Sequence, residues 1–185
     1  IVGGGNHFIA LKANGSVYTW GLNSSGQLGT GDNNNKTEPT KAKYAKYKSD
    51  GSIVAEDLTD IIDVAAGYNF TLALKKDGTV WSTGLNDKGQ LGNGTTENSN
   101  LFVQVKYADG AENLKNIIQI TAENETAHAL TKSGNVYSWG LNSSGQFGVG
   151  NTENSSYPVQ MLKVSDVAQI SGGANHLVMM LTDSS

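Results

Sequence analysis

The sequence predicts an all-β protein built from repeated four-stranded antiparallel units, which is the layout of β-propeller blades. Three observations support this class. One long segment recurs three times, short apolar runs alternate with turn residues, and no segment keeps an apolar period of 3.6 residues, so very little helix is expected. Glycine is abundant, with 23 residues, and proline occurs twice, which favours tight turns.

The recurring segment reads ALKANGSVYTWGLNSSGQLGTG, ALKKDGTVWSTGLNDKGQLGNG and ALTKSGNVYSWGLNSSGQFGVG, and its copies begin at Ala10, Ala73 and Ala129. The start of a fourth copy, GGANHLVMML, begins at Gly172. The segments that join one copy to the next differ in length, while the copies themselves do not. Fixed cores with variable connectors are typical of structural units linked by surface loops.

Each unit is expected to contain four short strands. Two apolar runs flank a turn that carries Asn-Gly at residues 14–15 and Asp-Gly at 77–78. These residues accept positive φ, so the pattern favours a hairpin. A further run lies upstream, as in DIIDVAAG (60–67), and another downstream, as in FVQVKY (102–107).

We divide the chain into repeats within one domain that spans residues 1–185. The approximate bounds are 1–50 for repeat 1, 51–113 for repeat 2, 114–164 for repeat 3 and 165–185 for the start of repeat 4.

The glycine-rich stretch WGLNSSGQLGTG (20–31) has two interpretations, a phosphate-binding loop or a structural joint. It lacks the Lys-Ser/Thr pair of a P-loop, and no helix is expected after it to hold an anion. Its recurrence with the same flanks favours the joint. We expect Asn23 to close an Asx turn, the Gln27 amide to bond the backbone of a neighbouring blade, and Leu28 to fill the core between units.

The pattern G-x-x-H-x-x-A-L, followed by G-x-V-Y-x-W-G-x-N-x-x-G-Q-L-G-x-G, resembles the repeat of the regulator of chromosome condensation (RCC1) family. The resemblance covers essentially the whole chain and implies a β-propeller that is normally closed by seven repeats. It implies no single activity, because the family includes a guanine-nucleotide exchange factor, ubiquitin-ligase modules, a secreted bacterial β-lactamase inhibitor and bacterial surface proteins. We expect a bacterial member.

Two copies depart from the family pattern. Thr83 stands where the other copies have Trp20 and Trp139, and the third copy has AENETAHAL in place of GGGNHFIAL. Three repeats and two extra strands leave edges and inner faces open. We therefore expect a partial propeller, or one that self-association completes.

Composition narrows the possible partners. The chain has 13 basic residues, all lysine, and a net charge of −4. Arginine supplies most bidentate contacts to phosphate and guanine, so no nucleic-acid partner is expected. The absence of cysteine excludes disulfides and thiolate chemistry. No apolar run approaches 18 residues, so no membrane insertion is expected, and an extracellular or cell-surface location is favoured.

The sequence offers no convincing catalytic constellation. His7 and His176 share a repeat position and His128 lies two positions away, so the three belong to different blades and are not expected to share a metal. The acidic residues are dispersed without an obvious acid/base pair. We expect no enzyme activity, no cofactor and no metal.

The variable connectors, residues 36–57 and 97–113, are the predicted binding surface, because rigid propellers bind through their loops. Lysines and tyrosines cluster in the first connector, where the alternative is a solvated loop. The candidate binding residues are Lys41, Lys43, Tyr44, Tyr47, Glu97, Asn98 and Tyr107. The predicted function is a non-enzymatic scaffold for protein–protein interaction. The alternatives are a carbohydrate- or cell-wall-binding module of a secreted bacterial protein and, less favoured, a guanine-nucleotide exchange regulator.

Overall fold

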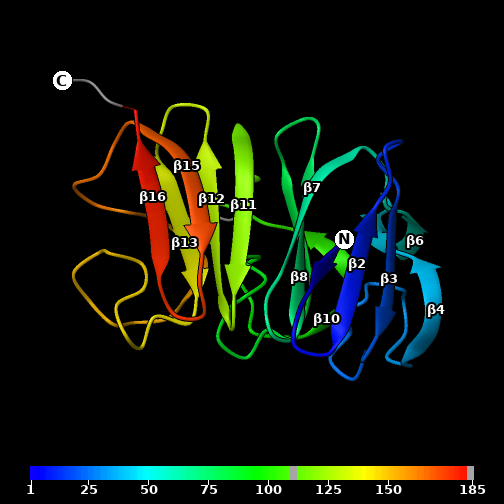
Figure 1. Cartoon of the computed structure of the whole chain (residues 1–185). Helices are drawn as coiled ribbons and strands as arrows, with labels where there is room; N and C mark the ends of the chain where they lie inside the picture. Colours follow the sequence, from blue (N-terminus) through cyan, green and yellow to red (C-terminus); the bar gives the residue numbers. More distant parts are fainter. Residues whose placement is uncertain (109–111, 183–185) are drawn as a thin grey trace.

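A computed structural model describes residues 1–108 and 112–182, and all regular elements in these residues are β-strands. Three four-stranded antiparallel units, here called blades 1, 2 and 3, precede a two-stranded unit, blade 4 (Figure 1). Two further strands, β5 (Lys43–Tyr47) and β6 (Ile53–Asp57), extend the sheet of blade 2 to six strands. Blade 1 contains β1 (Val2–Gly3), β2 (His7–Leu11), β3 (Val17–Gly21) and β4 (Lys36–Lys41). Blade 2 contains β7 (Ile61–Ala66), β8 (Phe70–Lys75), β9 (Val80–Gly84) and β10 (Ser99–Gln104). Blade 3 contains β11 (Ile117–Glu123), β12 (Thr126–Thr131), β13 (Val136–Gly140) and β14 (Ser155–Gln160), and blade 4 contains β15 (Val167–Gly172) and β16 (Leu177–Leu181). The predicted all-β, four-stranded units are confirmed.

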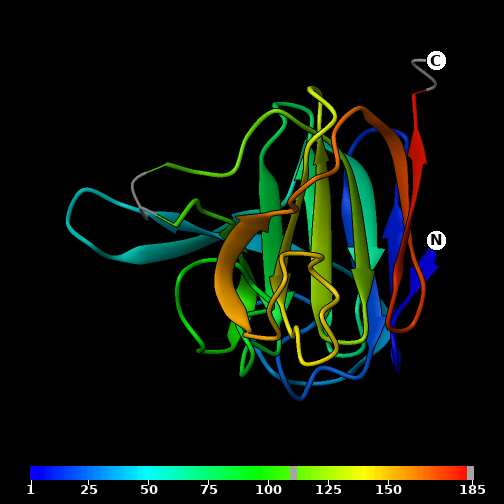
Figure 2. The ribbon, with the colours of Figure 1, turned by 90° about the vertical axis from the view of Figure 1, so that its left-hand side faces the viewer.

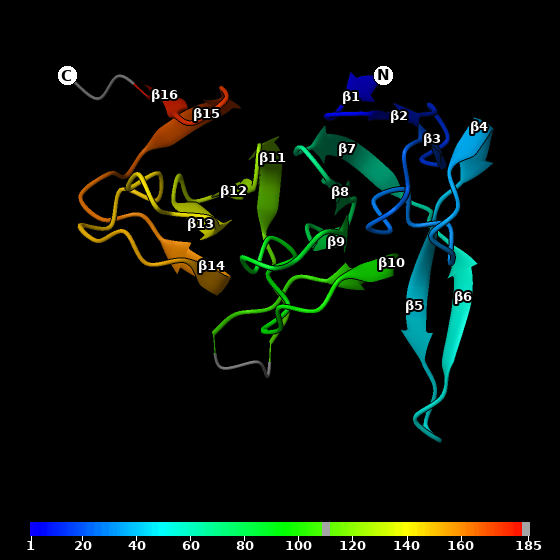
Figure 3. The ribbon, with the colours of Figure 1, turned by 90° about the horizontal axis from the view of Figure 1, so that it is seen from below.

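The blades form a fan. Seen from below, the first strands of the blades lie near one another and the fourth strands β4, β10 and β14 lie at the outside (Figure 3). Contacts between β7 and β11 and between β11 and β15 hold the inner strands together. In the part of the chain that the structure describes, no helix is long and apolar enough to cross a bilayer.

A hairpin that the sequence analysis did not predict joins blade 1 to blade 2. Its strands are β5 (Lys43–Tyr47) and β6 (Ile53–Asp57), and it projects away from the blades (Figures 2 and 3). β5 pairs in parallel with β10 at a single registered position, Tyr44 with Phe102. The expectation that residues 36–57 form a loop is therefore wrong, since β4, β5 and β6 occupy most of that segment.

The predicted hairpin turns are present, but only their glycines adopt positive φ. Gly15 has φ 79° and Gly78 has φ 81°, whereas Asn14 and Asp77 do not enter the left-handed region. Asn14 acts differently, because its Oδ1 accepts the backbone N–H of Ser16 at 3.1 Å. The side chain closes an Asx turn and the glycine then reverses the chain.

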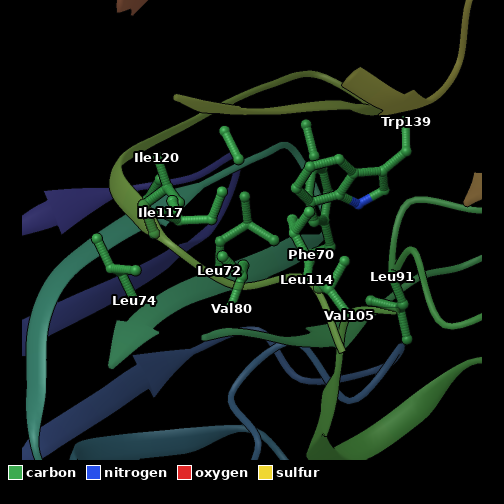
Figure 4. Packing of buried hydrophobic residues seen from close by; sticks show 13 residues of the cluster. Phe70, Leu72, Leu74, Val80, Leu91, Val105, Leu114, Ile117, Ile120 and Trp139 are labelled. Atoms are coloured by element: carbon green, nitrogen blue, oxygen red, sulfur yellow. The ribbon is translucent and has the colours of Figure 1, made fainter. Parts of the chain in front are cut away.

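The core lies between neighbouring blades. β8 and β12 are buried along nearly their whole length because each has a blade on both sides, while β2 alternates between buried and exposed residues on the open face of blade 1. Figure 4 shows the cluster between blades 2 and 3, where Trp139 reaches over the apolar residues of β8. Separate clusters join blade 1 to blade 2 and blade 3 to blade 4. Burial between sheets, and not within one sheet, therefore stabilises the fan.

Candidate binding surface

The glycine-rich loop of each copy is closed by its asparagine. In the second copy, Asn86 Oδ1 accepts the Leu91 N–H at 2.9 Å, while Nδ2 donates to the carbonyls of Thr95 at 3.0 Å and Glu97 at 2.9 Å. The equivalent asparagines of the other two copies make the same three kinds of bond. The expected Asx turn is wrong at this position, because the side chain is buried and spans a much longer loop.

In the first two copies, the backbone carbonyl of the glutamine accepts a hydrogen bond from the next blade. Gln90 Oε1 accepts the N–H of Lys88 at 2.9 Å within its own loop, and the Gln90 carbonyl accepts the Trp139 indole N–H from blade 3 at 2.8 Å. In the first copy, the Gln27 amide also reaches Asn69 Oδ1 of blade 2 at 3.4 Å. The expected bond from the glutamine amide to the backbone of a neighbouring blade is therefore wrong for the first copy, where the amide reaches a side chain. The Gln27 carbonyl accepts the Thr71 hydroxyl of blade 2 at 2.7 Å, so in both copies the carbonyl joins the blades.

Close packing against Trp139 requires a glycine two residues after Gln90, at Gly92. Gly92 has φ 60°, and a Cβ there would lie 2.7 Å from Trp139 Nε1, closer than real Cβ atoms approach. The prediction that the apolar residue of the loop fills the core is confirmed, because Leu28, Leu91 and Phe147 are all buried.

The loop has no free set of amides for a phosphate. Five N–H groups of residues 25–31 already donate to oxygen atoms of the protein. Their donors are Ser25, Gly26, Leu28, Gly29 and Gly31. An anion would have to replace these bonds, so the structure favours the joint over the phosphate site.

The β5–β6 hairpin is fixed at its base. Ala42 and Leu58, which flank it, are buried, and the Leu58 N–H donates to the Ala42 carbonyl at 2.9 Å. The Lys43 N–H donates to the carbonyl of Gly29 in the joint of blade 1 at 2.7 Å. The repeated loop thus holds the hairpin in place.

Side chains on the hairpin pair with each other. Glu56 accepts from Lys46 Nζ and from the Tyr44 hydroxyl, both at 2.8 Å. These bonds lower the pKa of Glu56 and raise the pKa of both Lys46 and Tyr44. A second ion pair, Lys41 with Asp57 at 2.7 Å, raises the pKa of Lys41. Because both ion pairs are exposed, they stiffen the hairpin more than they stabilise the fold.

The hairpin presents an exposed apolar pair near its tip. Tyr47 and Ile53 are register partners, and their side chains are 66% and 54% exposed. Below them, Tyr44 packs edge-on against Trp81 of blade 2, with ring centroids 5.2 Å apart. A large aromatic side chain on an anchored frame is the usual form of a binding hot spot.

The seven candidate binding residues do not form one surface. The hairpin and its base bring together Lys41, Lys43, Tyr44 and Tyr47.

The other three lie in the second connector. Asn98 Oδ1 accepts the Asn86 N–H at 2.8 Å, and the Glu97 carbonyl accepts from the Asn86 side chain, so both take part in the loop closure. Tyr107 packs edge-on against Tyr137 of blade 3. Residues 109–111 of the predicted 97–113 surface lie outside the described residues.

Neither Ile53 nor Trp81 is among the binding residues predicted from the sequence. The signal for the hairpin was present, because Asp50-Gly51 separates two runs with strand-like alternation. Gly51 has φ 81° in the turn. The lysines in these runs are typical of a solvated loop, and this opposes the prediction of strands.

His7 and His128 are buried and His176 is exposed, and the three do not converge on one site. His7 Nε2 lies 3.0 Å from Thr71 Oγ1, and burial lowers the pKa of His7 to about 4. The Thr71 hydroxyl donates to the Gln27 carbonyl, so His7 Nε2 carries the proton in this bond. Within residues 1–108 and 112–182, no group of three His, Asp or Glu side chains could hold a metal ion.

Blade 3 contains a buried polar chain that the sequence analysis did not foresee. His128 Nδ1 lies 2.7 Å from Ser138 Oγ, and its Nε2 lies 3.4 Å from Glu123 Oε1. The residue types are those of a catalytic triad, but the imidazole is turned the other way, with Nδ1 on the serine and Nε2 on the carboxyl group. Ser138 and His128 are also fully buried, so no substrate could reach the serine. We therefore assign a structural role to the buried Glu123–His128–Ser138 series.

Models of the regulator of chromosome condensation (RCC1) repeat match residues 14–74, 77–123 and 133–180, and a second model of that repeat matches 61–90 and 117–146. The chain belongs to the RCC1 repeat family. Each matched segment crosses from the later strands of one blade into the first strands of the next, so the sequence repeat and the blade are offset.

Human proteins are among the relatives of this chain. The chain is 34% identical to X-linked retinitis pigmentosa GTPase regulator over 158 residues, which is 85% of this chain and 14% of that protein. It is 36% identical to probable E3 ubiquitin-protein ligase HERC3 over 180 residues, which is 96% of this chain and 16% of that protein. The chain therefore spans a small part of both relatives.

Solved structures show the same fold. Human WBSCR16 superposes with a TM-score of 0.74 at 22% identity, covering 96% of this chain and 44% of that one. Yeast RCC1 (Prp20), in its complex with Kap60, gives a TM-score of 0.75 at 21% identity, covering 98% of this chain and 42% of that one. The blades described above are RCC1-type β-propeller blades.

Proposed function

We propose that this chain is a non-enzymatic scaffold that binds a protein partner through the tip of the β5–β6 hairpin. The observation that carries the proposal is the exposed Tyr47–Ile53 pair on a hairpin whose base is fixed by Ala42 and Leu58. Because the hairpin is already ordered before it binds, binding does not carry the entropic cost of ordering it.

Solved relatives support a role in protein binding. One describes yeast RCC1 bound to Kap60, and another describes the binding of Prp20p to Gsp1p and histones. These partners are properties of those proteins. For this chain, they favour the general class of function, a propeller that contacts other proteins.

A carbohydrate-binding module is the second proposal, and guanine-nucleotide exchange is the third. Half-buried Trp81 beside exposed Tyr47 suits a sugar in residue type. However, the Trp81 ring already contacts Tyr44 and the Lys75 ammonium, which lies 5.8 Å from its centroid. This occupancy leaves less of the ring for stacking and favours the protein partner.

Self-association is a proposed property of the isolated chain. Among the strands of the described residues, β16 pairs only with β15, and it exposes Val178, Met180 and Leu181, each more than half accessible. An apolar strand edge recruits further strands. Sedimentation velocity should show a concentration-dependent shift to larger species, and a stable monomer at high concentration would rule this property out.

The test of the scaffold proposal is partner binding by hairpin variants. Proteins retained from an extract of the source organism by the wild-type chain are quantified by mass spectrometry, then compared for Tyr47→Ser/Ile53→Ser and for Ile62→Ser. Ile62 is a matched control, because it is 52% exposed but lies on β7 of blade 2. We expect the double variant to lose a specific partner that the control retains. Equal retention by all three proteins would refute the role of the hairpin.

A further inference from the structure

We propose that the groove between the hairpin and blade 2 binds a short partner segment in which an acidic side chain lies close to an apolar one. This inference rests on the scaffold function proposed above and names the chemistry of the segment.

The groove exists because two strands diverge. β5 and β10 share one registered pair, and beyond it the hairpin leaves blade 2 while β10 continues along the blade (Figure 3). A cleft of about 240 Å³ opens between them. Its apolar surface comes from Ala45 and Tyr47 of β5, Trp81 of β9 and Val103 of β10.

The rim of the groove carries hydrogen-bond donors and one positive charge. Asn93, Gln104 and Lys106 line it together with Thr95, and none of the described residues that line it is acidic. The Lys106 ammonium makes no ion pair or hydrogen bond within the described residues. This contrasts with the nearby lysines Lys41 and Lys46, whose charges are paired.

Charge complementarity therefore selects the ligand. A carboxylate can accept from Lys106 Nζ and from the Gln104 amide, while an adjacent apolar side chain contacts Val103 and the part of Trp81 that lines the groove. A sugar would need the face of Trp81 for stacking, and Tyr44 and Lys75 already contact that ring. The groove thus fits an acidic-apolar peptide better than a glycan.

The test selects random displayed peptides on the 185-residue chain, with counter-selection on Lys106→Glu. We expect the enriched peptides to share an Asp or Glu within about three residues of an aliphatic or aromatic residue. No enrichment over the counter-selected pool, or enrichment of lysine-rich peptides, would overturn the proposal.

An enriched peptide, labelled with fluorescein, is then titrated in polarisation assays against four proteins whose folding is checked by circular dichroism. We expect Lys106→Gln to weaken binding at least about threefold, and Lys48→Gln to leave it unchanged, because Lys48 is also unpaired but lies in the exposed hairpin turn, outside the groove. Equal weakening by both variants would show a non-specific charge effect and overturn the site.

The fourth protein, Ile53→Ser, separates the two proposals, because Ile53 does not line the groove. If Ile53→Ser loses the protein partner while no peptide binds the wild type, the hairpin function stands and the groove proposal fails. The chemical shift of the Trp81 indole N–H is a further readout. If it changes when an oligosaccharide such as maltotetraose is added, and does not change with the peptide, the groove binds a glycan and the peptide proposal fails.

Discussion

Asn86→Ala tests whether the repeated loop is a structural joint. The substitution removes the hydrogen bonds of a buried side chain. Asn86 Oδ1 accepts the Leu91 N–H, and the two N–H groups of Nδ2 are shared by three acceptors, the carbonyls of Thr95 and Glu97 and, at 3.2 Å, Thr95 Oγ1. The hydrogen bonds of three N–H groups are therefore lost. At about 1 kcal/mol for each bond, the free energy of unfolding should fall by about 3 kcal/mol. In a chain of this size, that corresponds to a decrease in Tm of about 6–12 °C.

The assay is thermal and urea unfolding followed by far-UV circular dichroism, with Asn93→Ala as the control. Asn93 also bonds a backbone N–H in this loop, that of Thr95 at 3.1 Å, but at an exposed position. The control should lose less than about 1 kcal/mol. If the free energies of unfolding of Asn86→Ala and the control differ by less than about 0.5 kcal/mol, the repeated loop is not a structural joint.

Three further predictions concern buried polar groups. The unfolded chain binds more protons than the folded chain between the lowered pKa of His7, about 4, and the ordinary histidine pKa of 6.5. Stability should therefore fall by up to about 3 kcal/mol as pH drops through this window, and His7→Phe should remove that loss in urea titrations at several pH values. Trp139→Phe should cost about 1–3 kcal/mol in thermal unfolding, because it leaves the Gln90 carbonyl without its donor. His128→Leu should cost about 3 kcal/mol, because it strands the buried Glu123 carboxylate, and adding Glu123→Gly should recover part of the loss in a double-mutant cycle.

Each of these has a clear contrary result. A His7→Phe variant with the same pH dependence as the wild type would assign the acid sensitivity to other groups. Unchanged stability of Trp139→Phe would show that apolar packing alone holds blade 3 to blade 2. Strictly additive effects of the Glu123 and His128 substitutions would show that the two side chains do not interact.

The blades could be predicted from the sequence because their signals are local and recur. A turn glycine such as Gly15 and an apolar loop residue such as Leu91 have the same neighbours in every copy, so each copy supports the interpretation of the others. The exact partners of Asn86 could not be predicted, because they depend on where a loop of eleven further residues returns in space.

The hairpin and its groove were harder to predict because they occur in one connector only. The side chain of Tyr47 lines a cleft with Trp81 and Lys106, which come from distant parts of the chain. Their proximity follows from the pairing of β5 with β10, and no sequence pattern signals that pairing. The Glu123–His128 contact is local by comparison, because both residues lie in AENETAHAL (122–130) and the pairing of β11 with β12 brings them together.

The most direct test of the central claim separates the joint from the binding surface. A partner retained by the wild-type chain is titrated, at a temperature where all proteins are folded, against Tyr47→Ser/Ile53→Ser and Asn86→Ala. The account predicts that the hairpin variant loses at least about tenfold in affinity with little change in Tm, and that the loop variant keeps its affinity but loses stability. Loss of affinity in the loop variant, with unchanged affinity in the hairpin variant, would contradict it.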